Sequence, residues 1–143
     1  MASEAEKRLL TYGACAGLAI AMHRLTGWPL IKITDAHAVY PDPASPDLAD
    51  QPAHVRAATS NVVGMGAGGL HWMVLTPEGD LLDIDGRRDP LDVLDDYDDE
   101  ADDGVSALGQ VSLDDALDEY VTAKGEPLPL SRCEQIARHL LSV

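Results

Sequence analysis

Three residue types that together support nucleophilic acyl chemistry occur along this chain in the order that such chemistry needs. Cys15 falls in the first turn of a predicted helix, where backbone N–H groups and the helix dipole favour a thiolate and can hold an oxyanion. His71 opens a predicted strand, and Asp83 and Asp85 lie on the strand that returns beside it. An acid there can reach the imidazole and fix its tautomer, which leaves the other ring nitrogen for the thiol.

The choice between the two acids depends on the predicted hairpin. Residues 77–80 form a turn, and a strand rises ~3.3 Å per residue, so residues near 83–86 fold back beside residues near 71–74. Asp83 and Asp85 share one face by the two-residue period of a strand. Asp83 lies deeper in the strand, whereas Asp85 is followed by Gly86 at the expected strand end. The pattern favours Asp83 as the orienting acid and keeps Asp85 as the alternative.

Two segments carry a family resemblance, Gly13–Leu30 (GACAGLAIAMHRLTGWPL) and His71–Gly86 (HWMVLTPEGDLLDIDG). Together they resemble small bacterial and phage proteins of the papain-like, transglutaminase-like cysteine hydrolase superfamily. The resemblance implies an α+β fold in which an N-terminal Cys-bearing helix packs on a small antiparallel sheet, followed by C-terminal helices. It also implies Cys15 as nucleophile, His71 as base and Asp83 as orienter, in hydrolysis, deamidation or acyl transfer.

Other residues of the same types have plainer interpretations. A single Cys on an apolar helix face is usually a small hydrophobic residue, which is the interpretation for Cys133 and the alternative for Cys15. His54 is the second candidate base, because residues 53–59 can be read as a strand. The two cysteines form no C-x-x-C pair or Cys/His cluster, so we expect two thiols, no metal site and no cofactor.

Two further motifs do not predict a ligand site. Gly64, Gly66 and Gly69 match G-x-G-x-x-G, but a dinucleotide fingerprint needs a strand before it and a helix after it, and here a strand follows. The acids near residues 96–100 alternate but lack the central Gly and closing Glu of an EF-hand loop. We interpret the first as a loop and the second as a solvated surface.

Periodicity and capping signals predict the elements that position these residues. We expect helices over 3–10, 14–26, 112–124 and from 131 onward, strands over 30–34, 71–76 and 81–85, a loop over 41–52, and a segment over 53–63 that fits either a short helix or a strand. The chain is predicted to be a single domain, with 35–69 as an insertion and 89–104 as an acidic loop or frayed helix.

Charge and composition limit the classes of partner. The chain has 143 residues, 45% of them hydrophobic and 24% charged, and its net charge is −15. Nine acids and no base lie between Asp89 and Asp103, so most of the excess charge is local. Such a surface repels phosphate backbones and anionic lipid, which argues against nucleic acid and membrane partners. No apolar run is long enough to span a membrane and the start has no signal-peptide layout, so we expect a cytoplasmic protein.

Two functions follow as hypotheses. The first is a papain-like cysteine hydrolase or acyltransferase that uses Cys15, His71 and Asp83 on an amide, peptide or thioester substrate. The second is a catalytically degenerate relative, of a kind that phages encode, that acts as an acidic protein-binding module or inhibitor. Both favour a protein or peptide as the partner, and the acidic segment favours a cationic one.

Overall fold

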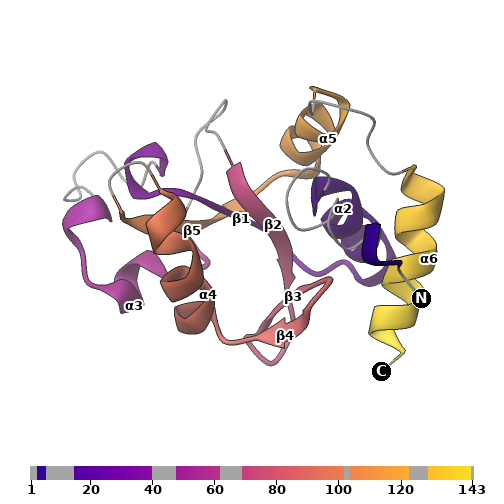
Figure 1. The fold of residues 1–143 in the computed structure, drawn as a ribbon, viewed down its shortest axis with the longest axis horizontal. Coiled ribbons are helices and arrows are strands. Elements are labelled where there is room, and N and C mark those ends of the chain that lie inside the picture. Colours follow the sequence, from indigo (N-terminus) through magenta and orange to yellow (C-terminus); the bar gives the residue numbers. More distant parts are fainter. Residues whose placement is uncertain are drawn as a thin grey trace.

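An antiparallel sheet of five strands, in the order β4-β3-β2-β1-β5, forms the centre of an α+β fold (Figure 1). The computed structural model describes residues 3–5, 15–39, 48–61, 69–101, 104–122 and 129–142. Its strands are β1 (Leu30–Asp35), β2 (Gly69–Leu75), β3 (Leu81–Asp83), β4 (Gly86–Arg88) and β5 (Ser106–Val111). Its α-helices are α2 (Cys15–Thr26), α3 (Ala53–Arg56), α4 (Pro90–Tyr97), α5 (Leu113–Thr122) and α6 (Leu130–Leu141), and its short 3-10 turns are η1 (Ala36–Ala38), η2 (Leu48–Asp50) and η3 (Asp98–Glu100).

The two faces of the sheet carry different hydrophobic clusters, because side chains alternate along each strand. Figure 1 shows α2, α5 and α6 on one side of the sheet and α3 and α4 on the other. The α2 face contributes the buried side chains Leu30, Trp72, Val74 and Leu82. The α4 face contributes Ile31, Ile33, Met73 and Leu81, which pack with Val93 and Leu94 of α4. This division decides which site residues can meet.

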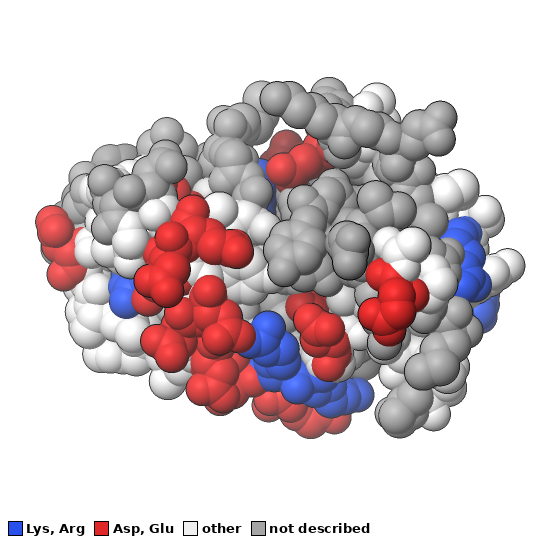
Figure 2. Space-filling view, in the orientation of Figure 1, with Lys and Arg blue, Asp and Glu red and all other residues white. Residues whose placement is uncertain are grey.

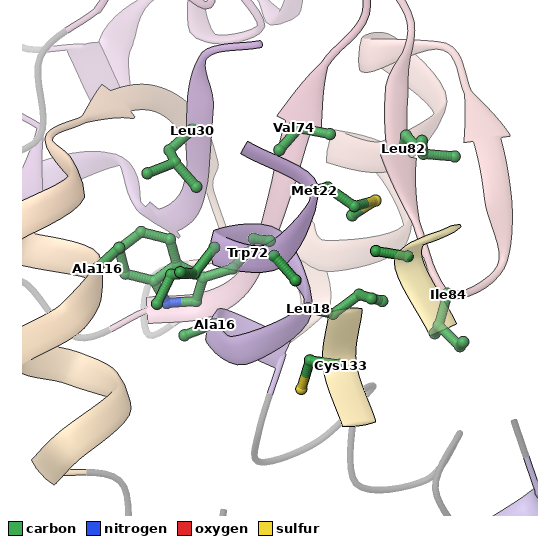
Figure 3. Close-up of a cluster of buried hydrophobic side chains, with 14 of the residues drawn as sticks. Ala16, Leu18, Met22, Leu30, Trp72, Val74, Leu82, Ile84, Ala116 and Cys133 are labelled. Carbon is green, nitrogen blue, oxygen red and sulfur yellow. The ribbon is translucent and has the colours of Figure 1, made fainter. Parts of the chain in front are cut away.

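The first two turns of helix α2 are buried on all sides. Residues 16–22 are all buried, and Figure 3 shows Ala16, Leu18 and Met22 within the cluster that includes Trp72 and Cys133. A helix that is apolar all round belongs inside the fold, here between the sheet and α5 and α6. The predicted C-terminus is confirmed, because the Gly27 N–H donates to the His23 carbonyl at 2.7 Å with a positive Gly27 φ of 75°.

Gly17 gives a test of this packing. A Cβ at position 17 would lie 3.0 Å from Cys133 Sγ and 3.1 Å from Tyr120 Cε2. We expect Gly17→Ala to lower the free energy of unfolding by about 1–2 kcal/mol, because an overpacking cost of about 1–3 kcal/mol exceeds the gain in helix propensity. Urea denaturation measures the change. Adding Cys133→Ala should recover part of the loss, and additive losses in the double variant would contradict the contact.

The predicted hairpin is confirmed, but its second strand ends earlier than expected. Strands β2 and β3 pair antiparallel through Val74 and Leu82, and the Thr76 N–H donates to the Asp80 carbonyl at 2.8 Å to close the turn. We expected a strand over 81–85 that ends at Gly86. The chain instead turns at residues 84–85, and Gly86, with a φ of 100°, begins β4 opposite Asp83. A positive φ at this position favours glycine.

The acidic segment over 89–104 was predicted to be a loop or a frayed helix. The loop prediction is wrong for most of the segment. Residues 90–97 form α4, and residues 98–100 continue as η3. The Asp89 side chain caps the helix by accepting the Leu91 N–H, and Pro90 occupies the first turn. Val93 and Leu94 are buried against the sheet, so the acids are left on the outer side (Figure 2). Tertiary burial of that apolar stripe stabilises the helix.

Three other expectations need correction or completion. Strand β5 was not predicted, although it pairs along the whole of β1. Residues 53–56 form a helix and not a strand, and the insertion over 35–69 also contains η1 and η2. Helix α6 begins at Leu130 after Pro129, one residue before the predicted Ser131 cap. By contrast, the Ser112 cap of α5 is confirmed, because Ser112 Oγ accepts the Asp115 N–H at 3.1 Å.

Some expectations fall on residues outside the described ranges. These are residues 6–10 of the predicted first helix, most of the 41–52 loop, residues 64–68 of the glycine-rich stretch, and the end of the 112–124 helix. Glu4 and Ala5 are helical, as predicted.

Candidate active site

His71 and Asp83 form a buried hydrogen-bonded pair. Their Nε2 and Oδ2 atoms lie 2.7 Å apart, and the side chains are only 1% and 3% exposed. A carboxylate can only accept, so the ring donates its Nε2–H to Asp83. This bond fixes the tautomer, and Nδ1 is then the ring nitrogen that can take a proton from another group.

The turn after β3 holds the Asp83 carboxylate in place. Its second oxygen, Oδ1, accepts the backbone N–H of Asp85 at 2.8 Å. Each oxygen therefore has a donor, and the carboxylate cannot rotate without breaking one of these bonds. Asp85 lies in the turn with an exposed side chain. The contact with His71 thus belongs to Asp83 and not to Asp85, because the chain reverses at residue 84 and ends the two-residue alternation.

The sheet register places His71 on the α4 face. It lies opposite Ile33 of β1, and Ile33 belongs to the cluster that packs against α4. Its ring stacks on Tyr97, the last residue of α4, with centroids 5.3 Å apart and planes inclined by 13°. Tyr97 was not predicted as a site residue. The Asp89-Pro90 start signal could have revealed the helix, but nothing local indicates that residue 97 meets residue 71.

The predicted nucleophile stands on a different element. Cys15 is the first residue of α2, as the sequence predicted, and α2 has no acidic residue in its first turn. The helix packs against the Trp72 and Val74 face, whereas His71 and Asp83 are on the face covered by α4. The position of the Cys15 side chain is outside the described part of the structure. The structure therefore brings together two of the three predicted residues.

The remaining predicted candidates are placed away from this pair. Cys133 is 0% exposed in the α2 cluster, so its predicted core role is confirmed. His54, the second candidate base, is exposed on α3. His23, which was not a candidate, has its Nδ1 2.7 Å from the Trp28 carbonyl oxygen, beyond the end of α2.

Lys32 is another buried charged side chain, on the α2 face. Its Nζ lies 5.0 Å from the Trp72 ring centroid and 3.4 Å from Glu119 Oε2 of α5. Cation–π and ionic contacts together offset the cost of burying an ammonium group. This arrangement attaches α5 to the sheet, and the sequence analysis did not identify it.

Within the described ranges, no group of three or more His, Cys, Asp or Glu side chains could hold a metal ion. Over the same residues, no helix has both the length and the apolar character needed to cross a membrane.

A second polar network fixes the end of α4 beyond Tyr97. Asp98 Oδ1 accepts the Ser106 hydroxyl at 2.6 Å and the Ser106 N–H at 2.9 Å, and it also accepts Arg56 Nη1 at 3.2 Å. Arg56 donates as well to the Ser106 carbonyl at 2.7 Å. Burial acts to raise the pKa of the Asp98 carboxyl, but these hydrogen bonds and the Arg56 charge outweigh it and lower the pKa. The network joins α3, η3 and β5.

This network makes a pH-dependent contribution to stability. Because the pKa of Asp98 is lowered in the fold, its contribution is fully present above the unfolded-state pKa and is lost as pH falls through the folded-state value. We expect Asp98→Asn to destabilise the protein by about 1–2 kcal/mol at neutral pH. The difference in the free energy of unfolding between this variant and the wild type should become smaller as the pH falls below the ordinary titration range of aspartate. Urea denaturation at several pH values measures it, and a constant difference would contradict the assignment.

Comparisons of the chain with protein-family models, with curated proteins and with solved structures found no match.

Proposed function

We propose that the chain is a papain-like cysteine hydrolase or acyltransferase acting on an amide, peptide or thioester, with Cys15 as nucleophile, His71 as base and Asp83 as orienting acid. The observation that carries the proposal is the 2.7 Å bond between His71 Nε2 and Asp83 Oδ2, two side chains that are both buried. Such a bond fixes the tautomer that a general base needs, and Nδ1 is then the nitrogen that would take the thiol proton.

The proposed reaction proceeds through an acyl-enzyme. His71 Nδ1 takes the Cys15 proton, and the thiolate bonds to the carbonyl carbon of the substrate. The intermediate collapses as the C–N or C–S bond breaks, and the imidazolium returns its proton to the leaving group. Water then hydrolyses the acyl-enzyme, or an amine or thiol takes the acyl group in the transferase version.

The start of α2 supports the nucleophile role. The first N–H groups of a helix have no partner within the helix and carry the positive end of its dipole. No acid in the first turn of α2 opposes this effect. The helix is also buried along residues 16–22, so its first turn is part of a rigid element. The N–H groups and the dipole favour a thiolate at Cys15, and the rigid helix holds its first turn in place.

The substrate or partner that the surface favours is a cationic protein or peptide. The exposed acids of α4 and η3 are Asp92, Asp95, Asp96, Asp99 and Glu100, and Figure 2 shows acidic side chains, in red, gathered on one part of the surface. They lie on α4, whose last residue contacts His71, and on η3, which follows it. A local negative potential raises the concentration of cationic ligands near it.

Alkylation of the two thiols tests the proposal. Iodoacetamide is added at several pH values, and the labelled peptides containing Cys15 and Cys133 are quantified by mass spectrometry. We expect Cys15 to label rapidly even near pH 6, well below the ordinary thiol pKa of about 8.5, and Cys133 to label slowly. Asp83→Asn should slow the Cys15 reaction while Asp85→Asn should not. A Cys15 rate that follows an ordinary thiol at every pH would exclude the proposal.

A second candidate is a non-catalytic acidic binding module of the same superfamily. It is favoured by the placement of α2 and His71 on opposite faces of the sheet, and by the 1% exposure of His71 under Tyr97. In this case the exposed acids of α4 would bind a basic protein. Retention of an oligolysine peptide should be lost in Asp92→Asn/Asp95→Asn/Asp99→Asn and kept in Cys15→Ala. Equal retention by both variants would exclude the binding surface.

A further inference from the structure

Tyr97 covers one side of the His71 imidazole. The two rings are nearly parallel, with planes inclined by 13° and centroids 5.3 Å apart. His71 comes from β2 and Tyr97 from the end of α4, so this contact joins the sheet to the helix that covers it. Offset stacking at this separation is a favourable arrangement for two aromatic rings.

The residues before and after Tyr97 in the sequence are both anchored in the fold. One turn before it, Val93 and Leu94 are 0% and 1% exposed in the cluster with Met73 and Leu81. Residues three and four apart share a helix face, so Tyr97 is directed to the sheet by the same packing. One residue after it, Asp98 is bound by Ser106 and Arg56. Tyr97 therefore has little freedom to move away from His71.

A single hydrogen bond does not by itself fix an imidazole ring. The bond from Nε2 to Asp83 sets the direction of one ring nitrogen, but a bond at one atom does not define the plane of the ring. A second ring stacked on its face restricts the tilt of that plane. Because Nδ1 lies across the ring from the bonded nitrogen, the stacking also sets the direction in which Nδ1 points.

We propose that Tyr97 is a positioning residue for His71, which holds the imidazole plane so that Nδ1 is presented in one direction. This role deepens the proposed function, on which it rests, because Nδ1 is the nitrogen that would take the Cys15 proton. It also connects the acidic helix α4 to the site, since Tyr97 is the last residue of that helix.

The test compares Tyr97→Phe, which keeps the ring, with Tyr97→Leu, which removes it. Leu91→Ala is the matched control, because Leu91 is 47% exposed on the same helix. The first readout is the NMR signals of the His71 ring, including exchange of its Nε2–H with solvent. The second is the iodoacetamide rate at Cys15.

We expect Tyr97→Leu to shift the His71 ring signals, speed the exchange of its Nε2–H, and slow Cys15 labelling by roughly 3- to 10-fold, the range that corresponds to one aromatic pair. Tyr97→Phe and Leu91→Ala should match the wild type in both readouts. If Tyr97→Leu leaves the His71 signals and the Nε2–H exchange unchanged, or if Tyr97→Phe behaves like Tyr97→Leu, the positioning role is overturned. If the His71 signals change as expected but wild-type Cys15 reacts as an ordinary thiol, the positioning of His71 stands and the proposed function fails.

Discussion

Replacing Asp83 by alanine is expected to lower the free energy of unfolding by about 2–4 kcal/mol. Two buried or partly buried donors, His71 Nε2–H and the Asp85 N–H, lose their acceptor in this variant. Each buried donor left without a partner costs about 1–3 kcal/mol, and removing one member of a buried pair costs more than the pair contributed. Urea denaturation followed by circular dichroism measures the loss.

Asp85→Ala is the matched control, because it changes the same residue type two positions away. The Asp85 side chain is exposed, so its removal should change stability by no more than about 0.5 kcal/mol. Equal losses of stability in the two variants would contradict the prediction, because they would show that any acid in this turn matters as much as the one bonded to His71. Asp83→Asn refines the comparison, because it keeps the shape and one acceptor oxygen.

Removing the Cys15 thiol is expected to abolish acyl-enzyme formation. With p-nitrophenyl acetate, the thiolate would take the acetyl group as the ester C–O bond breaks, and one equivalent of nitrophenolate would appear as a burst. We expect Cys15→Ala to lose the burst and to lower turnover on the order of 10³-fold or more, as loss of a catalytic nucleophile does. Stopped-flow absorbance measures the burst amplitude.

Cys133→Ala is the control for this experiment. Cys133 is 0% exposed in the α2 cluster, so the variant should keep the full burst amplitude while it loses some stability. A burst that persists in Cys15→Ala would assign the reaction to another group. A wild type without any burst would favour the acidic binding module over the enzyme.

Local patterns in the sequence were sufficient for α2 and for the central hairpin. Both depend on signals within a few residues: the apolar run closed by Gly27 for the helix, and the turn over 77–80 for the hairpin. That an acid of the returning strand lies near His71 was predicted for the same reason, because a tight turn sets which residues of two adjacent strands are neighbours. Only the choice between Asp83 and Asp85 needed the observed reversal at residue 84.

Contacts between distant segments could not be predicted in this way. Strand β5 is apolar only in part, and its place beside β1 depends on a pairing across more than 70 residues. The acidic segment becomes α4 because Val93 and Leu94 find a buried sheet face, which local composition does not reveal. The same docking brings Tyr97 onto His71.

The sequence by itself therefore determined the Cys-bearing helix, the hairpin and the placement of an acid of the returning strand beside His71, because each follows from short-range geometry. The tertiary structure alone decided that α2 packs on one face of the sheet while His71 and Asp83 lie on the other under α4. The alternation of side chains along a strand shows which residues share a face of the sheet, but it does not show which helix will cover that face. Which helix covers which face depends on the complementary burial of apolar side chains throughout the fold.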